Sequence, residues 1–223
     1  MTILGSIEAV ILDVDGTVAT CPYDFEEMRA EVRKAAARRG LDVDELGVRG
    51  IIEQIEAAAR RLGDNGPRFR EEAEAAVRGI EIETARTAAL LPGAAEALAA
   101  LRETGLGVGL ITRNCRPAAE IVLRDLRSYD VLLTRDDVPD SKPDPDHVRR
   151  ALDALGRPAE RAAVVGDHGY DMEAGRAAGV SLCIGVRTGS SSDASLLQSG
   201  AEVVIDSVAD LPLCLTMLRE RRQ

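Results

Sequence analysis

The chain contains very few aromatic side chains: tryptophan is absent, and its 223 residues include only two phenylalanines and three tyrosines. Few rings are therefore available for stacking on bases. The net charge of −10 also argues against the clustered cations that bind a phosphate backbone. Nucleic acid is thus not an expected partner. The hydrophobic core must be built from alanine, valine, leucine and isoleucine, which the hydrophobic content of 45% allows.

Cysteine and histidine are also scarce. The four cysteines stand far apart without a Cys-x-x-Cys pair, and only two histidines are present. Two histidines and such widely spaced cysteines leave too few ligands for a zinc site. Single cysteines at this spacing are typical of buried small hydrophobic residues in a reducing compartment. Residues 1–6 lack the beginning of a signal peptide, and no apolar run reaches the ~18 residues of a membrane span. We therefore expect a cytoplasmic protein with no membrane partner.

Short apolar runs recur along the chain and predict strands buried on both faces. Each run is rich in Val, Ile, Leu or Ala and ends near a turn or an acidic residue. Helix-length segments separate most of them; Pro92-Gly93 begins one, and Asp144-Pro145 begins another that ends at Gly156. This alternation predicts an α/β fold, a Rossmann-like parallel sheet sandwiched by helices. The expected strands are 9–12, 106–111, 131–133, 162–165, 181–186 and 203–205.

One long segment interrupts this alternation. Between residues 18 and 87 apolar side chains recur at helical spacing, as in Phe25, Met28 and Val32, and no strand-like run occurs. We interpret 18–87 as an all-helical domain inserted after the first strand, while 1–17 and 88–223 form the α/β core. The only low-complexity patch, residues 189–192, is interpreted as a surface loop.

Polar residues follow several of the expected strands. Ligands of parallel α/β sheets bind beyond the carboxyl ends of the strands, so these positions favour a functional site. Each one alone also fits a turn or a helix cap. Turn chemistry, however, does not require acids at two strand ends with a threonine and a lysine between them. The residues expected to converge at this edge are Asp13, Asp15, Thr112, Lys142, Asp167 and Asp171.

The scarcity of lysine also supports a functional site at this edge of the sheet. Only two of the 28 basic residues are lysines, Lys34 and Lys142. A compact ammonium suits a crowded site of carboxylates and phosphate better than a planar guanidinium does. Lys34 lies among arginines in a charge-rich helix and is expected on a solvated face. Lys142 is the one expected at the site.

In order and spacing, these motifs resemble the haloacid dehalogenase (HAD) superfamily. Residues 13–17, Asp-Val-Asp-Gly-Thr, are similar to its first motif, and Thr112 is similar to its second. Lys142 is similar to the third motif, and Gly166-Asp167 with Asp171 to the fourth. The resemblance spans the chain except for the insert, and that insert resembles the helical cap of phosphoglycolate-phosphatase-like members.

The resemblance implies an enzyme, a HAD-type phosphoric monoester hydrolase that acts on a small phosphorylated metabolite. Asp13 would be the nucleophile and form an aspartyl-phosphate. Asp15 would protonate the leaving oxygen and then activate water. Lys142 would neutralise the charges of nucleophile and phosphate, while Thr112 and the backbone around Arg113 would hold the phosphoryl oxygens.

The resemblance also implies Mg²⁺ as cofactor. The ion would be held by the Asp13 carboxylate, the Asp15 carbonyl and Asp167, with Asp171 supporting the ion or its waters. This agrees with the preference of Mg²⁺ for oxygen ligands. Two unit charges ~4 Å apart repel by ~4 kcal/mol at an effective dielectric constant of ~20, so an anionic nucleophile needs cations to approach a phosphate.

Two positions depart from the family pattern. His168 stands where a small serine is common, and Arg113 stands where asparagine is usual, with Asn114 one place later. We expect both differences to alter substrate contacts and not the reaction. For His168, a supporting or surface position is expected.

Other functions would use the same residues. The second acid, Asp15, favours a phosphatase or a sugar phosphomutase of the family, since dehalogenases lack it. A mutase would return the phosphoryl group to its substrate. A response-regulator receiver also uses strand-end Asp, Thr and Lys with Mg²⁺, but this chain is too long for one and carries the helical insert. The substrate, and the choice between monomer and homodimer, stay open.

Overall fold

The fold is that of a computed structural model, which describes residues 7–48 and 50–220. Residues 1–6, on which the expected absence of a signal peptide rests, lie outside the described residues. The chain forms two compact units, one from the segments up to Cys21 and from Ala88 onward, the other from Pro22–Thr87. Within the described part of the chain, no helix combines the length and hydrophobicity that a membrane span needs.

The first unit is built on a parallel sheet of six strands in the order β5-β4-β1-β6-β7-β8. Strand β1 lies inside the sheet, and all its residues are buried, as its unbroken apolar sequence requires. The predicted α/β sandwich is confirmed, and each predicted strand boundary agrees with the structure to within one residue. The strands are β1 (Ala9–Asp13), β4 (Gly107–Ile111), β5 (Val131–Leu133), β6 (Ala162–Gly166), β7 (Leu182–Val186) and β8 (Val203–Ile205).

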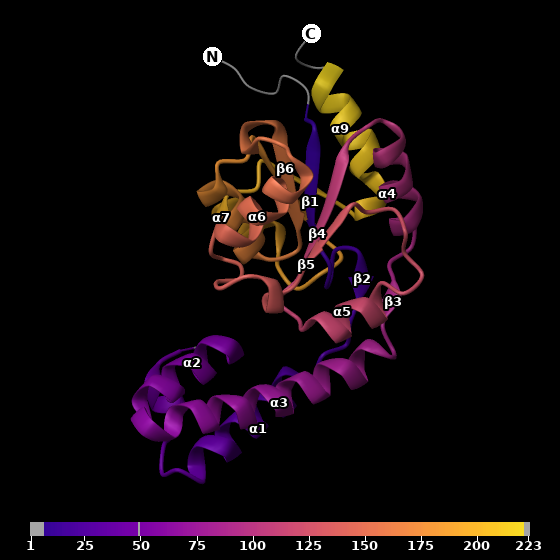
Figure 1. Cartoon of the computed structure of the whole chain (residues 1–223). Helices are drawn as coiled ribbons and strands as arrows, with labels where there is room; N and C mark the ends of the chain where they lie inside the picture. Colours follow the sequence, from indigo (N-terminus) through magenta and orange to yellow (C-terminus); the bar gives the residue numbers. More distant parts are fainter. Residues whose placement is uncertain (1–6, 49, 221–223) are drawn as a thin grey trace. The chain divides into compact units, whose positions relative to one another are not determined.

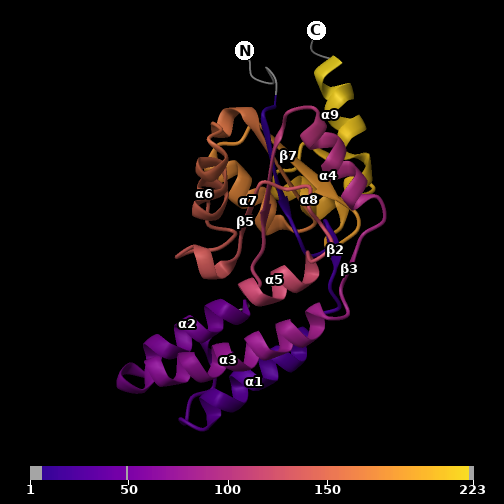
Figure 2. The ribbon, with the colours of Figure 1, turned by 45° about the vertical axis from the view of Figure 1, so that its right-hand side comes forward.

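Helices cover both faces of this sheet (Figures 1 and 2). On one face Ala9 and Ile11 of β1 pack with Val148 and Leu152 of α6 and Ala174 of α7. Helix α8 packs against α7 on this side, and α4 with α9 covers the other face. The helices are α4 (Ala94–Glu103), α5 (Arg116–Val122), α6 (Asp146–Leu155), α7 (Gly169–Ala178), α8 (Asp193–Ser199) and α9 (Leu211–Glu220).

The second unit consists of helices α1 (Phe25–Ala37), α2 (Ile51–Arg61) and α3 (Gly66–Ala85). Its own core contains Met28, Val32, Ile55, Phe69 and Val77. These side chains follow the helical periodicity of the sequence, which places them on the inward faces of their helices.

A short antiparallel pair of strands was not predicted. Strands β2 (Ala19–Thr20) and β3 (Ala89–Leu90) pair where the chain leaves and rejoins the first unit. Two residues are too few to show an alternating pattern, so the sequence offered no sign of this pairing.

The first turn of α6 holds a buried histidine. The side chain of His147 is fully buried, and its Nε2 lies 3.2 Å from the carbonyl oxygen of Leu133. A carbonyl oxygen only accepts, so Nε2 carries a hydrogen. Burial is the main cause that lowers the pKa of His147 from 6.5 to about 4, and the nearby Lys142 adds to it.

We predict that His147 makes the fold acid-sensitive. Its folded pKa lies below its unfolded pKa of 6.5, so the unfolded chain binds the proton first as the pH falls from about 6.5 to about 4. Between pH 7 and pH 5 the wild type should lose about 2 kcal/mol more unfolding free energy than His147→Gln, which keeps a donor and cannot titrate. Urea denaturation of both proteins at both pH values measures this difference. Parallel losses would contradict the assignment.

Candidate active site

The parallel register brings the ends of three strands together. Asp13 is the last residue of β1 and pairs with Ile111 of β4, so Thr112 follows beside it. Strand β6 runs on the other side of β1 and leads into Asp167. Residues more than 150 positions apart in the sequence therefore share one sheet edge, as the sequence analysis predicted.

Lys142 lies between two carboxylates at this edge. Its ammonium donates to Oδ1 of Asp13 and to Oδ1 of Asp171, the latter at 2.6 Å. All three side chains are buried, with the lysine only 3% exposed. The loop before α6, which carries Lys142, thus inserts a cation among the acids. Lys34, the other lysine, is half-exposed and pairs with Glu31 on the surface of α1.

Burial and neighbouring charges both shift the pKa values of Asp13 and Lys142. Burial raises the pKa of Asp13 well above its ordinary value; Lys142 opposes this shift, and Asp171, Asp15 and Asp167 add to it. Burial alone would lower the pKa of Lys142, but Asp13 and Asp171 outweigh it and raise that pKa, so the ammonium stays charged. The carboxylates of the site outnumber its one ammonium, so their excess negative charge favours binding of a further cation.

Asp15 is held from the β4 side of the site. Its Oδ2 accepts hydrogen bonds from the Thr112 hydroxyl and from the Asn114 side-chain amide, both at 2.7 Å. The Asn114 backbone N–H in turn donates to the Thr112 hydroxyl at 3.1 Å. Asn114 was not among the predicted site residues. The available signal was its position two residues after Thr112, one place after the position where the family usually has asparagine.

Asp167 is held by the loop that follows β7. Its Oδ2 accepts from the Ser190 backbone N–H at 2.8 Å and from the Ser190 hydroxyl at 3.3 Å. Burial raises the pKa of Asp167, and the Ser190 N–H opposes the shift. Residues 189, 190 and 192 are exposed, as the interpretation of 189–192 as a surface loop predicts, and this loop in addition contacts an acid of the site.

Arg113 and His168 lie beside the acid cluster. The Arg113 guanidinium lies over the ring of Tyr170 at 5.2 Å, and its carbonyl accepts from Arg135 at 2.9 Å. The exposed His168 caps α7: its Nδ1 accepts from the Tyr170 N–H at 3.2 Å. This agrees with the supporting position expected for His168. The Arg113 side chain stacks on an aromatic ring, while the phosphate contact predicted near Arg113 involves its backbone.

The acids at this edge fit a divalent cation. Asp13, Asp167 and Asp171 each offer one carboxylate oxygen, and these three oxygens lie within 4.8 Å of one another. All three residues are buried, and hard carboxylate oxygens are the donors that Mg²⁺ prefers. Burial is the main cause of the raised pKa of both Asp13 and Asp167, and the neighbouring Asp171 carboxylate adds to both shifts.

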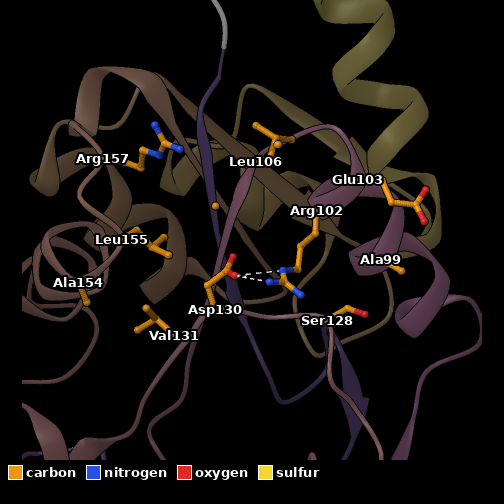
Figure 3. Close-up of a pocket in the computed structure, with 12 residues that line it drawn as sticks. Ala99, Arg102, Glu103, Leu106, Ser128, Asp130, Val131, Ala154, Leu155 and Arg157 are labelled. Atoms are coloured by element: carbon orange, nitrogen blue, oxygen red, sulfur yellow. Dashed lines mark hydrogen bonds and ion pairs between the residues drawn. The ribbon is translucent and has the colours of Figure 1, made fainter.

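A surface depression of about 720 Å³ lies at the opposite edge of the sheet, near the beginnings of β4 and β5 (Figure 3). Two of its charged side chains are already paired with each other. Arg102 donates twice to Oδ1 of Asp130, at 3.0 and 2.6 Å, and Oδ2 of Asp130 accepts from the Val108 N–H at 2.9 Å. The depression is therefore not the catalytic candidate, in spite of its size.

Comparisons with known proteins assign the family. The haloacid dehalogenase-like hydrolase family matches residues 7–179. With this match, the parallel sheet and the acids at its edge, the chain belongs to the haloacid dehalogenase-like hydrolase family. It is a phosphatase-type enzyme of that family, as its motifs predicted.

Individual relatives agree with this assignment. The chain is 31% identical over 224 residues to a plasmid phosphoglycolate phosphatase of Cupriavidus necator, covering 95% of this chain and 94% of that one. It is 30% identical to the N-acetylmuramic acid 6-phosphate phosphatase of Pseudomonas aeruginosa, over 92% and 93% of the two chains. Among solved structures, CbbY of Rhodobacter sphaeroides in complex with phosphate has a TM-score of 0.62 and 26% identity, over 92% and 96%.

We predict that loss of the buried ammonium destabilises the fold. In EDTA, Lys142→Met should lower the free energy of unfolding by about 3 kcal/mol, because it leaves buried carboxylates without their cation. Lys34→Met, the matched control on the surface, should cost less than about 1 kcal/mol. Urea denaturation of the two variants and the wild type measures both effects. Equal losses in the two variants would show that the buried ammonium contributes no special stability.

Proposed function

We propose that this protein is a Mg²⁺-dependent phosphatase that hydrolyses a small phosphomonoester through an aspartyl-phosphate on Asp13. One observation carries the proposal. The Asp13 carboxylate ends the buried strand β1, contacts the Lys142 ammonium and shares a cluster of oxygens with Asp167 and Asp171. A nucleophile, a charge-neutralising group and a set of cation ligands are thus within reach of one phosphoryl group.

The metal would be held by Asp13, Asp167 and the backbone carbonyl of Asp15, with Asp171 supporting the ion or its waters. When bound, Mg²⁺ supplies positive charge for the nucleophile and for the phosphoryl oxygens. Asp171 is already occupied by the protein, because Oδ1 accepts from Lys142 and Oδ2 from the His168 N–H at 3.0 Å. This supports the indirect role proposed for Asp171.

In the first step, a carboxylate oxygen of Asp13 attacks phosphorus and forms a new P–O bond. The bond from phosphorus to the leaving oxygen breaks, and that oxygen takes a proton from the Asp15 carboxyl. The Thr112 hydroxyl and the backbone N–H groups around Arg113 would hold the phosphoryl oxygens. Lys142 remains charged throughout and balances the negative charge on Asp13.

In the second step, Asp15 takes a proton from water, whose oxygen attacks phosphorus. The bond between phosphorus and Asp13 breaks, which releases phosphate and restores the Asp13 carboxylate. The hydrogen bond from the Asn114 amide to Oδ2 of Asp15 orients this carboxyl group for both proton transfers, while the Thr112 hydroxyl, which contacts Oδ2 in the structure, would turn its one hydrogen to the phosphoryl group.

The substrate we propose is phosphoglycolate or another small phosphomonoester. The names of the two full-length relatives, which give phosphoglycolate and N-acetylmuramic acid 6-phosphate, support this class. We further propose that residues 18–87 act as a cap that excludes water during the reaction. Most of this segment, Pro22–Thr87, folds as a separate helical unit, which supports the cap. The wide spacing of the four cysteines along the sequence supports a reducing location, for which we propose the cytoplasm.

The first test is phosphate release from p-nitrophenyl phosphate, phosphoglycolate and N-acetylmuramic acid 6-phosphate, with Mg²⁺ and with EDTA. We expect turnover only with Mg²⁺, and a loss of at least about 10³-fold in kcat for Asp13→Asn. Asp125→Asn, at an exposed carboxylate, is the matched control and should keep wild-type activity. Activity that survives in Asp13→Asn would overturn the mechanism. Isomerisation of a sugar phosphate without net phosphate release would favour a mutase instead.

The role of Asp15 predicts that Asp15→Asn releases nitrophenolate in an initial burst. Nitrophenolate leaves without a proton, so Asp15→Asn should still transfer the phosphoryl group from p-nitrophenyl phosphate to Asp13. Hydrolysis of the aspartyl-phosphate should then slow by about 10²-fold, since general base catalysis contributes at least that much. Stopped-flow absorbance should show one nitrophenolate per active site before the slow phase. A linear time course, with no hydroxylamine-sensitive phosphate on the protein, would argue against the intermediate.

A further inference from the structure

The loop after β7 makes an unusually close approach to one acid of the site. Oδ2 of Asp167 accepts two hydrogen bonds from Ser190, one from the backbone N–H at 2.8 Å and one from the hydroxyl at 3.3 Å. With Oδ2 engaged in this way, the Asp167 carboxylate has Oδ1 left for another ligand. No catalytic step proposed above uses Ser190.

Two glycines allow the loop and the first motif to enclose this carboxylate. A Cβ on Gly189 would lie 1.9 Å from Oδ2 and 2.1 Å from Cγ of Asp167, which is far too close for any side chain. On the other side, a Cβ on Gly16 would lie 2.9 Å from the same Cγ, and Gly16 has a φ of +87°. The Asp167 carboxylate is thus held between two stretches of backbone.

The same loop also holds the turn that carries Asp15. The Thr188 hydroxyl donates to the carbonyl oxygen of Gly16 at 2.6 Å. The loop is itself anchored at both ends: the Arg187 N–H donates to the Ile205 carbonyl at 3.1 Å, and the Ser192 hydroxyl caps α8. An anchored loop that contacts both Asp167 and Gly16 fixes the distance between them.

We propose that residues 188–190, here called the clamp, position the metal ligand: Ser190 engages Oδ2 of Asp167 so that Oδ1 is presented to Mg²⁺. This inference rests on the proposed function, in which Asp167 binds the ion. Carboxylate ligands are commonly oriented by such outer hydrogen bonds, and the loss of these partners weakens metal binding by about 10- to 100-fold. The clamp residues are positioning residues and contact neither substrate nor ion.

The test is Mg²⁺ titration by calorimetry on the full-length protein without substrate. Ser190→Ala removes the weaker of the two hydrogen bonds and should raise the Kd about fivefold. Gly189→Ala forces the carboxylate to move and should raise the Kd by about 10- to 100-fold. Ser191→Ala, a neighbouring serine of the same loop, is the matched control and should leave the Kd unchanged. Melting temperatures in EDTA should be the same for Ser190→Ala and Ser191→Ala.

Asp167→Asn, titrated alongside, separates the two proposals. An unchanged Kd in Asp167→Asn would overturn the metal site itself. A raised Kd for Mg²⁺ in Asp167→Asn, together with an unchanged Kd in Ser190→Ala and in Gly189→Ala, would overturn only the clamp. If Gly189→Ala does not fold, the Kd for Mg²⁺ of Ser190→Ala is compared with that of Ser191→Ala. Equal values would overturn the clamp. The substrate KM at saturating Mg²⁺ should be unchanged in Ser190→Ala, because the clamp acts on the ion.

Discussion

The ion contacts of Lys142 are the interaction on which the rest of the site depends. Asp13 and Asp171 are buried and lie close to Asp167, and their charges would repel strongly without a cation between them. The single ammonium reaches two of these carboxylates. Since an unpaired buried charge is costly, the loop of Lys142 and the strand ends must come together in one arrangement. The same excess of carboxylate oxygens fits a divalent cation.

The parallel sheet makes this arrangement possible. Because all six strands run in the same direction, their carboxyl ends meet at one edge, and the loops that follow them meet there too. β1 lies between β4 and β6, so Asp13 has Thr112 on one side and Asp167 on the other. The strands themselves contribute little chemistry. They bring into contact side chains that the sequence separates.

Two contacts of the site show where prediction from sequence stopped. Asn114 binds Asp15 across 99 positions, and Ser190 binds Asp167 across 23. Neither residue type is unusual where it stands: asparagine and serine are common in loops and caps. The role of each depends on which loop lies next to it, and that follows from the strand order. The antiparallel pair of β2 and β3 was missed for a related reason, because two residues show no periodicity.

The sequence by itself determined the α/β class, most strand boundaries and the acids at the strand ends, because hydrophobic periodicity and breaks in it are local properties of the chain. It also singled out Lys142, since lysine is so rare here. Only the tertiary structure decided which oxygen binds which donor: that Oδ2 of Asp167 is taken by Ser190, and that Lys142 bridges Asp13 and Asp171. These choices depend on the packing of loops distant in sequence, which no local pattern records.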